Sequence, residues 1–296
     1  MQTIWLPDAK PRPRRLAVGE FDGVHAGHRE VIRGSDAVLT FEPHPRTVVA
    51  PQAAPKLLTT LDQKTDLIAA LGVEELIVVP FDGARAAQTA QDFIDQELVQ
   101  RLGATQVSVG ENFRFGNKAK GDVDLLRAQD AFTTSVAKMV EVDGEIVSST
   151  HIRGLIVAGA VAKAARFLGL PYHMRGIVGH GDKRGRTLGF PTANIVPDNA
   201  LVYPGNGVYA CRAALEEDGE WRWWPAAVSI GVRPTFVTGR GVLIEAYLIG
   251  YEGDCYGREL RLAFLDRLRG EKRFDSIEAL IEQMDRDVED TRRIAA

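Results

Sequence analysis

Two histidines three residues apart occur in the stretch GEFDGVHAGHREVI, residues 19–32. His25 and His28 follow an apolar run and precede residues that favour a helix. A turn between a parallel strand and a helix lies at the carboxyl edge of the sheet, where free N–H groups and the helix dipole attract anions. Gly23 and Gly27 would let the backbone approach a phosphate closely, and imidazole N–H groups would stabilise the negative charge that develops in phosphoryl or nucleotidyl transfer.

The spacing leaves two other roles open for this histidine pair. Both side chains are compatible with ordinary helix capping and packing. A metal site is the third alternative, but zinc needs three or four protein ligands, and no nearby cysteine or carboxylate pair completes such a set.

The second half of the chain contains a glycine-rich basic segment, GHGDKRGRTLGFPTAN, residues 179–194. It does not match the P-loop pattern, so it is either a phosphate-binding loop of another kind or a plain turn that leads into a strand. Thr192 and Asn194 are two residues apart, so in a strand their side chains point the same way. A hydroxyl and an amide oxygen together would suit Mg²⁺. Glu245 is a lone carboxylate in the apolar stretch VLIEAYL, which the pattern alone also allows as a solvent-facing position.

The elements that must position these residues change character along the chain. Up to about residue 170, apolar runs typical of strands alternate with helical patterns, which predicts parallel βαβ units and an α/β sheet of the nucleotide-binding type. The strand-like runs are 15–21, 37–43, 75–81, 106–113 and 135–142, and the helical patterns are 61–72, 89–103 and 151–169. The crossover between Phe21 and Ala37 is close to the minimum of about a dozen residues, so the first helix must be very short.

Beyond a linker marked by Gly169 and Pro171, the pattern is mostly strands. Short apolar segments separated by Gly, Pro and Asp turns predict a small antiparallel β-barrel. One amphipathic helix with a Ser276 cap closes the chain. The predicted domains are therefore residues 1–170 and 171–296.

Composition limits the classes of function. The chain has 296 residues, 45% of them hydrophobic, with 36 basic and 40 acidic residues and a net charge of −4. This balance predicts no nucleic-acid partner, whereas local basic clusters in NFRFGNKAKG and GDKRGRTLG suit a small phosphate-bearing molecule. Without a long apolar run or a signal-like N-terminus, we expect a cytoplasmic protein with no membrane partner. Cys211 and Cys255 fit reduced, packed side chains. The sequence does not determine the oligomeric state.

Ordered motifs along nearly the whole chain resemble the bacterial bifunctional riboflavin kinase/FAD synthetase family. The motifs are GEFDGVHAGHREVI, LTFEPHP, VGENFRFG, SSTHIR, GDKRGRTLGFPTAN, GVY, IGVRPTF, IEAYL and RLRGEKRFDS. The resemblance implies an N-terminal, Rossmann-like FMN adenylyltransferase (nucleotidylyltransferase) domain and a C-terminal riboflavin kinase barrel. It also implies riboflavin, FMN, FAD and ATP as substrates and products, with Mg²⁺ as cofactor.

The same resemblance assigns roles to individual residues. His25 and His28 would stabilise the α-phosphate of ATP as FMN attacks it, and Glu245 would take the proton from the riboflavin 5′-hydroxyl. Thr192 and Asn194 would hold Mg²⁺. Flavin contacts are expected from His44, Asn112, Arg114 and Arg269. The expected ATP and phosphate contacts are Gly23, Gly27, Ser148, Ser149, Thr150, Arg153, Gly181, Lys183, Gly185, Arg186, Gly189 and Thr192.

The chain departs from the family pattern in two places. The segment after GHREVI is shorter than usual, and Ala160 stands where an acidic residue is common. Two other functions remain as alternatives: a nucleotidylyltransferase whose second half only binds flavin, and a flavin-storing or flavin-sensing protein. The retained Glu245, Thr192 and Asn194 argue against both, since storage requires neither a base nor metal ligands.

Overall fold

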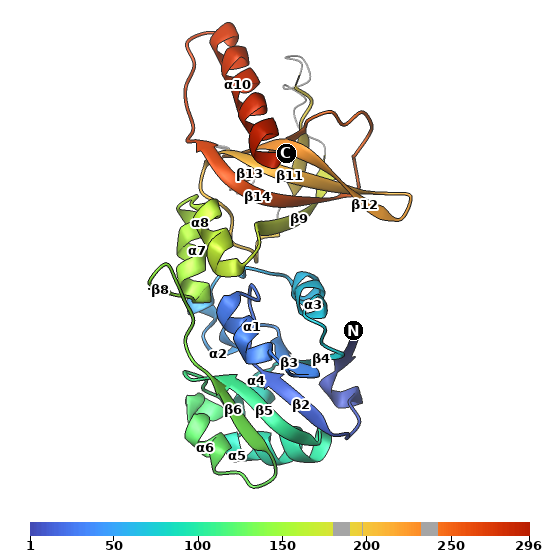
Figure 1. The fold of residues 1–296 in the computed structure, drawn as a ribbon, viewed down its shortest axis with the longest axis vertical. Coiled ribbons are helices and arrows are strands. Elements are labelled where there is room, and N and C mark those ends of the chain that lie inside the picture. The colour runs from blue at the N-terminus through green and yellow to red at the C-terminus, as the bar shows by residue number, and fades with distance from the viewer. Residues whose placement is uncertain (180–189, 197, 232–241) are drawn as a thin grey trace. The chain divides into compact units, whose positions relative to one another are not determined.

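The structure is a computed structural model that describes residues 1–179, 190–196, 198–231 and 242–296 (Figure 1). By internal packing the chain divides into two compact units, Met1–Ser149 and Thr150–Ala296. The functional division at residues 170 and 171 is a separate prediction from the sequence. It falls after two helices whose residues, apart from Ser149, belong to the second unit by packing.

The N-terminal unit contains a six-stranded parallel sheet in the order β1-β4-β3-β2-β5-β6. This confirms the predicted α/β sheet. Its strands are β1 (Gln2–Trp5), β2 (Arg14–Val18), β3 (Ala37–Glu42), β4 (Glu75–Pro80), β5 (Ala104–Gly110) and β6 (Thr133–Ala137). The sequence pattern does not reveal β1, because this edge strand is mostly exposed and carries no alternating apolar pattern.

Helices cover both faces of this sheet. Alternate residues of the central strands point to opposite faces, so Leu39 and Phe41 join one core cluster and Val38 joins the other. The helical segments are η1 (Leu6–Asp8), α1 (Ala26–Ile32), α2 (Pro45–Val49), η2 (Pro51–Ala53), α3 (Leu61–Ala69), α4 (Gly83–Ala87), α5 (Ala90–Asp92), the π-helical η3 (Phe93–Arg101), η4 (Asn117–Ala119) and α6 (Val123–Arg127). The short α1 is as the crossover length predicts. A two-stranded ribbon, β7 (Glu141–Val142) and β8 (Glu145–Ile146), follows the sheet.

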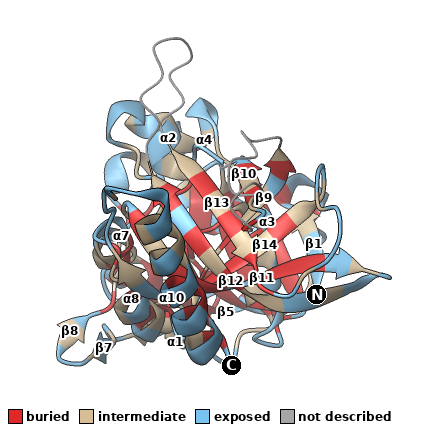
Figure 2. Cartoon of the chain, turned by 90° about the horizontal axis from the view of Figure 1, so that it is seen from above, coloured by how far each residue is buried: buried red, intermediate tan, exposed pale blue. Residues whose placement is uncertain are grey.

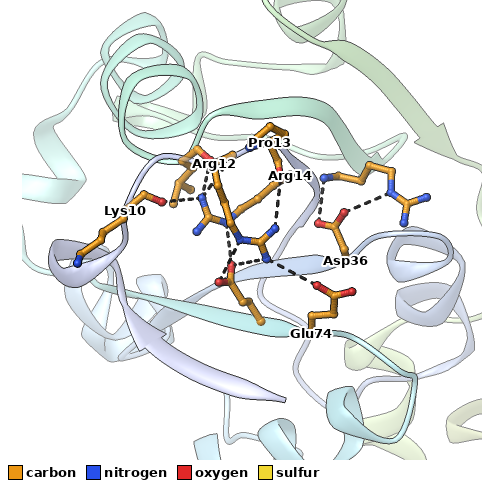
Figure 3. A network of polar contacts seen from close by, with 9 residues as sticks. Lys10, Arg12, Pro13, Arg14, Asp36 and Glu74 are labelled. Atoms are coloured by element: carbon orange, nitrogen blue, oxygen red, sulfur yellow. Dashed lines mark hydrogen bonds and ion pairs between the residues drawn. The ribbon is translucent and has the colours of Figure 1, made fainter.

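A buried ion pair ties β2 to β4 at the end of the sheet where both strands begin (Figure 3). The Arg14 side chain is only 2% exposed, and its Nε lies 2.8 Å from Glu75 Oε2. Its Nη1 donates to the Leu102 carbonyl at 2.6 Å, and Arg12 also contacts Glu75. Burial opposes ionisation of Glu75, but hydrogen bonds from Arg14 and Arg12 outweigh burial and lower the pKa of this carboxyl.

The C-terminal unit contains the predicted barrel, closed and antiparallel, in the order β10-β13-β12-β11-β14-β9. Its strands are β9 (Tyr172–Gly179), β10 (Ala193–Val196), β11 (Gly207–Glu217), β12 (Glu220–Gly231), β13 (Leu243–Leu248) and β14 (Glu259–Arg269). Helix α10 (Ile277–Ala295) is capped by Ser276 Oγ, which accepts from the Ala279 N–H at 3.1 Å, and it packs on β11, β12 and β14. Figure 2 shows long buried stretches in the barrel strands and exposed residues along α10.

The prediction of one helix over residues 151–169 is wrong. The structure has two, α7 (Ser149–Val157) and α8 (Val161–Leu168). Gly159 between them has φ +77°, and a Cβ there would lie 2.7 Å from the Tyr209 hydroxyl. The close approach of the barrel therefore requires a glycine and a chain reversal that hydrophobic periodicity does not encode.

Candidate active sites

The histidine turn follows β2 and leads into α1. His25 is the N-cap of α1, and its Nδ1 accepts the His28 N–H at 3.2 Å. The two rings are stacked with centroids 3.5 Å apart, and Phe21 contacts His28 edge-on at 5.4 Å. A neutral imidazole that accepts at Nδ1 carries its proton on Nε2, so this contact sets the tautomer of His25.

The backbone of this turn is strained, and buried hydrogen bonds stabilise its conformation. Phe21, Gly23 and Val24 all have positive φ, at 52°, 86° and 41°. Left-handed backbone at residues other than glycine costs on the order of 1–3 kcal/mol each and persists only where the surroundings enforce it. Asp22 enforces it by accepting from the Leu58 N–H at 2.9 Å and the Thr59 N–H at 3.0 Å. Sequence reasoning misses this anchor, because Asp22 and Thr59 are far apart in the chain.

Capping and nucleotide contact are compatible roles for this turn, because the cap uses one ring nitrogen of His25 and an imidazole has two. Among the described residues, no group of three His, Cys, Asp or Glu side chains is placed to hold a metal ion.

Ser149, the last residue of the N-terminal unit, lies against the same turn. Ser149 Oγ donates to the Asp22 carbonyl at 3.1 Å. Gly27 leaves room for the neighbouring ring, since a Cβ there would lie 3.3 Å from His25 and 4.0 Å from the Val147 carbonyl. Ser148 directly precedes α7, and Thr150 and Arg153 follow Ser149 within its first turns. The structure thus brings Ser149 to the turn that carries the histidines, while nucleotide contact by all four residues remains a prediction.

A cavity of about 910 Å³ lies within the N-terminal unit, at the carboxyl ends of β2, β3 and β4. Its walls include Phe41, Phe81, Phe93, Phe113 and Phe115. His44, Asn112 and Arg114 line the same cavity, although His44 is more than sixty residues from the other two in the sequence. This is a volume and a lining typical of sites for planar aromatic ligands.

The polar residues of this cavity are positioned locally. His44 is the N-cap of α2, and its Nδ1 accepts the Arg46 N–H at 3.1 Å. The Arg114 guanidinium lies 2.9 Å from Asp122. Phe115 is buried while Phe113 is half-buried, so only Phe115 is a core residue.

In the barrel, Asn194 and Glu245 are direct partners on β10 and β13. Directly opposite residues of antiparallel strands place their side chains on the same face, close together. On β13 the neighbours Ile244 and Ala246 are buried, whereas Glu245 is half-buried on the opposite face. Thr192 is half-buried immediately before β10. The carboxylate and the amide therefore come from two adjacent strands, and the hydroxyl comes from the residue just before one of them.

Two groups of predicted barrel residues have different outcomes. Gly181, Lys183, Gly185, Arg186 and Gly189 lie outside the described residues. Arg269 lies in β14, and its guanidinium forms an ion pair with Asp287 of α10. Its Nη2 and Nε donate to Asp287 Oδ2 at 2.7 Å and 3.1 Å. The structure gives Arg269 a partner that holds α10 on the barrel, and its flavin contact stays a prediction.

The chain thus has two candidate sites. One lies on a parallel sheet of the nucleotide-binding type, and the other lies on a barrel that places a carboxylate beside an amide. Together they indicate a nucleotide-dependent transferase with two reaction centres. Residues 8–151 match the model of the FAD synthetase family, and residues 168–295 match that of the riboflavin kinase family. The bifunctional riboflavin kinase/FMN adenylyltransferase of Bacillus subtilis is 37% identical to this chain, over 94% of this chain and 91% of that protein. The protein of the same name from Pseudomonas fluorescens is 36% identical, over 94% of this chain and 92% of that protein. The chain belongs to the bifunctional riboflavin kinase/FMN adenylyltransferase family.

A solved structure supports the fold along the whole chain. A Streptococcus pneumoniae protein described as a macrolide-efflux protein superposes with a TM-score of 0.89 at 30% identity, over 99% of both chains. In the described part of the present chain, no helix is long and apolar enough to cross a membrane.

Proposed function

We propose that this chain makes FMN from riboflavin and ATP in its C-terminal unit, and FAD from FMN and ATP in its N-terminal unit. The observation that carries the proposal is the pairing of Asn194 with Glu245 on adjacent barrel strands. This register places a carboxylate next to an amide oxygen, and a phosphotransfer site needs a base beside oxygen ligands.

In the kinase reaction, Glu245 accepts the proton of the riboflavin 5′-hydroxyl while that oxygen attacks the γ-phosphate of ATP, and ADP leaves. Thr192 and Asn194 offer a hydroxyl and an amide oxygen beside this carboxylate, which are donors that Mg²⁺ accepts. We infer that these two residues would hold Mg²⁺, which when bound neutralises charge on the ATP phosphates.

In the adenylyltransferase reaction, an FMN phosphate oxygen attacks the α-phosphate of ATP, and pyrophosphate leaves. The nucleophile is already ionised, so the protein positions the reactants and stabilises charge without a covalent intermediate. His25 and His28 are assigned that stabilisation, with Gly23, Gly27, Ser148, Ser149, Thr150 and Arg153 around the phosphates. The aromatic cavity with His44, Asn112 and Arg114 would take the flavin. Arg269 is assigned a flavin contact in the kinase unit.

We place the protein in the cytoplasm and assign it no nucleic-acid or membrane partner. Its charge is nearly balanced overall, and its two cysteines form no disulfide. These features suit a reducing compartment and small phosphorylated substrates.

The test is to incubate the purified chain with ATP and Mg²⁺ and either riboflavin or FMN, and to separate the flavins by chromatography. The proposal expects FMN and then FAD from riboflavin, and FAD with pyrophosphate from FMN. FAD from FMN without FMN from riboflavin would indicate a single adenylyltransferase. Tight flavin binding without turnover would indicate storage.

A further inference from the structure

Glu20 occupies the junction between the aromatic cavity and the histidine turn. It follows β2 and lines the cavity together with Phe41 and His44. The next residue, Phe21, contacts the ring of His28. A flavin nucleotide that places its ring among the aromatic residues and its phosphate at the histidines must pass Glu20.

One oxygen of the Glu20 carboxyl group lacks the hydrogen bonds that an ionised carboxylate needs. Its Oε2 is shielded from solvent and has no hydrogen-bond partner among the described residues. Buried charges require hydrogen bonds or a counter-ion, and an unsatisfied oxygen in a residue that lines a cavity is a group that a ligand can complete.

Lys64 is the positive charge that acts on both Glu20 and Glu42. Lys64 of α3 is buried, and its Nζ donates to Thr40 Oγ1 at 3.2 Å, while that hydroxyl donates to the Glu20 carbonyl at 3.0 Å. The same ammonium faces Glu20 and Glu42, and Asp22 adds a further negative charge. The hydrogen bonds to Asp22 described above satisfy that carboxylate, so Lys64 is left to compensate two glutamates with one charge.

Desolvation of Glu20 outweighs the attraction of Lys64 and raises the pKa of its carboxyl to about 8. Asp22 and Glu42 act in the same direction. At neutral pH the group therefore carries a proton, which makes it a hydrogen-bond donor rather than an anion.

We propose that Glu20 is a specificity-determining residue of the FMN site, whose neutral carboxyl group donates a hydrogen bond to the phosphate end of the flavin nucleotide. The inference rests on the proposed adenylyltransferase activity. A neutral donor accepts a phosphate next to the histidines, whereas a carboxylate at this point would repel it. A base is not needed there, since the FMN phosphate attacks in its ionised form.

Other charged groups also line the cavity or lie near Glu20. Arg46, Arg85, Arg114 and Lys118 line the cavity, while Lys64, Asp22 and Glu42 are the charged groups that act on Glu20. His44 lines the cavity as well, and the second ionisation of the FMN phosphate lies near pH 6. Glu20→Gln removes only the titration of Glu20, so a change in FMN affinity between pH 7 and 9 that this variant abolishes reports Glu20.

The experiment measures KM for FMN from pH 6.5 to 9.5 with the full chain at saturating ATP and Mg²⁺. For the native chain we expect KM to rise about tenfold between pH 7 and 9, as an anion forms beside the phosphate. In Glu20→Gln, whose amide donates but cannot ionise, KM at pH 7 should rise only about threefold and then stay flat. KM for riboflavin in the kinase reaction, measured in the same samples, is the control and should not follow this profile.

Three results would overturn the inference: a flat profile in the native chain, an unchanged rise in Glu20→Gln, or loss of FAD synthesis at pH 7 in that variant with intact kinase activity. The last would mean that the ionised form is required. Failure of the proposed function is distinct, because the native chain would then make no FAD from FMN at any pH, and the role of Glu20 would fall with it.

Discussion

Asn194 and Glu245 lie directly opposite each other on neighbouring antiparallel strands of the barrel, with Ser229 opposite Glu245 on its other side. The side chains of β10, β13 and β12 in this row share one face of the barrel. An amide oxygen and a carboxylate are thereby fixed side by side by the strand ladder rather than by a loop.

Asn194→Ala should lower the rate of riboflavin phosphorylation. A lost contact to a charged group costs about 1.5–3 kcal/mol, roughly 10- to 100-fold. A higher Mg²⁺ concentration should restore part of the rate, while FAD synthesis from FMN stays unchanged. Val196→Ala, at an exposed position of the same strand, is the matched control. A rate loss that Mg²⁺ does not relieve would argue against a metal-binding role for Asn194.

His28→Ala should stop FAD formation and let FMN accumulate. Removal of one donor that stabilises transition-state charge typically costs about 10²- to 10³-fold in rate. Both flavins are followed by chromatography after addition of riboflavin and ATP. Equal loss of the two activities would show that the substitution unfolds the chain or that the sites are not separate.

A fragment of residues 150–296 should phosphorylate riboflavin and form no FAD. A fragment that begins at residue 172 should be less stable, because it lacks α8, which packs on β9 and β14. That helix buries Val161, Ala164, Phe167 and Leu168, and one large apolar side chain contributes about 1.5–3 kcal/mol. Thermal inactivation of kinase activity in both fragments is the measurement. Equal stability of the two would make α8 a linker, in agreement with the division at residue 170.

Glu75→Gln should destabilise the N-terminal unit by about 3–5 kcal/mol, since it leaves the buried Arg14 without its counter-ion. FAD synthesis should be lost at a lower temperature than in the native chain, and riboflavin phosphorylation should keep its thermal profile. Glu74→Gln is the matched control, because the Glu74 side chain is 71% exposed. Unchanged thermal inactivation of FAD synthesis in Glu75→Gln would contradict a stabilising role for the pair.

The ion pair between Arg14 and Glu75 also predicts that the stability of the N-terminal unit depends on pH. The folded-state pKa of Glu75 is lowered, so its contribution is present above the unfolded-state value and is lost as the pH falls through the folded-state value. Stability of the N-terminal unit should decrease in acid below about pH 4.5, and Glu75→Gln should weaken that dependence.

The sequence predicts much of the fold, because period-2 and period-3.6 patterns reflect burial directly. Strands β2 to β6, the closed barrel and the terminal helix follow from them. The break at Gly159 does not, since it depends on Tyr209 in a distant strand. The π-helical geometry of η3 is likewise not visible in a pattern that reads as an ordinary helix.

The candidate sites show the same limit. The two-residue spacing of Thr192 and Asn194 predicts a shared direction, but only barrel closure sets Asn194 against Glu245. His25 and His28 are evident from their spacing, whereas the Asp22 anchor needs the fold. Glu20 stands in the first motif that the sequence presents, yet only its buried oxygen and the cavity beside it point to a role.

The central claim is that each unit carries its own reaction, and Glu245→Gln tests it most directly. Gln keeps the size of the side chain and its hydrogen bonding but cannot accept a proton, so loss of a general base should slow riboflavin phosphorylation by about 10²- to 10⁴-fold. Turnover of riboflavin at saturating ATP and Mg²⁺ is measured beside adenylylation of supplied FMN in the same preparation. The account predicts loss of the first and a native rate for the second. Native riboflavin turnover in this variant, or equal loss of both reactions, would contradict it.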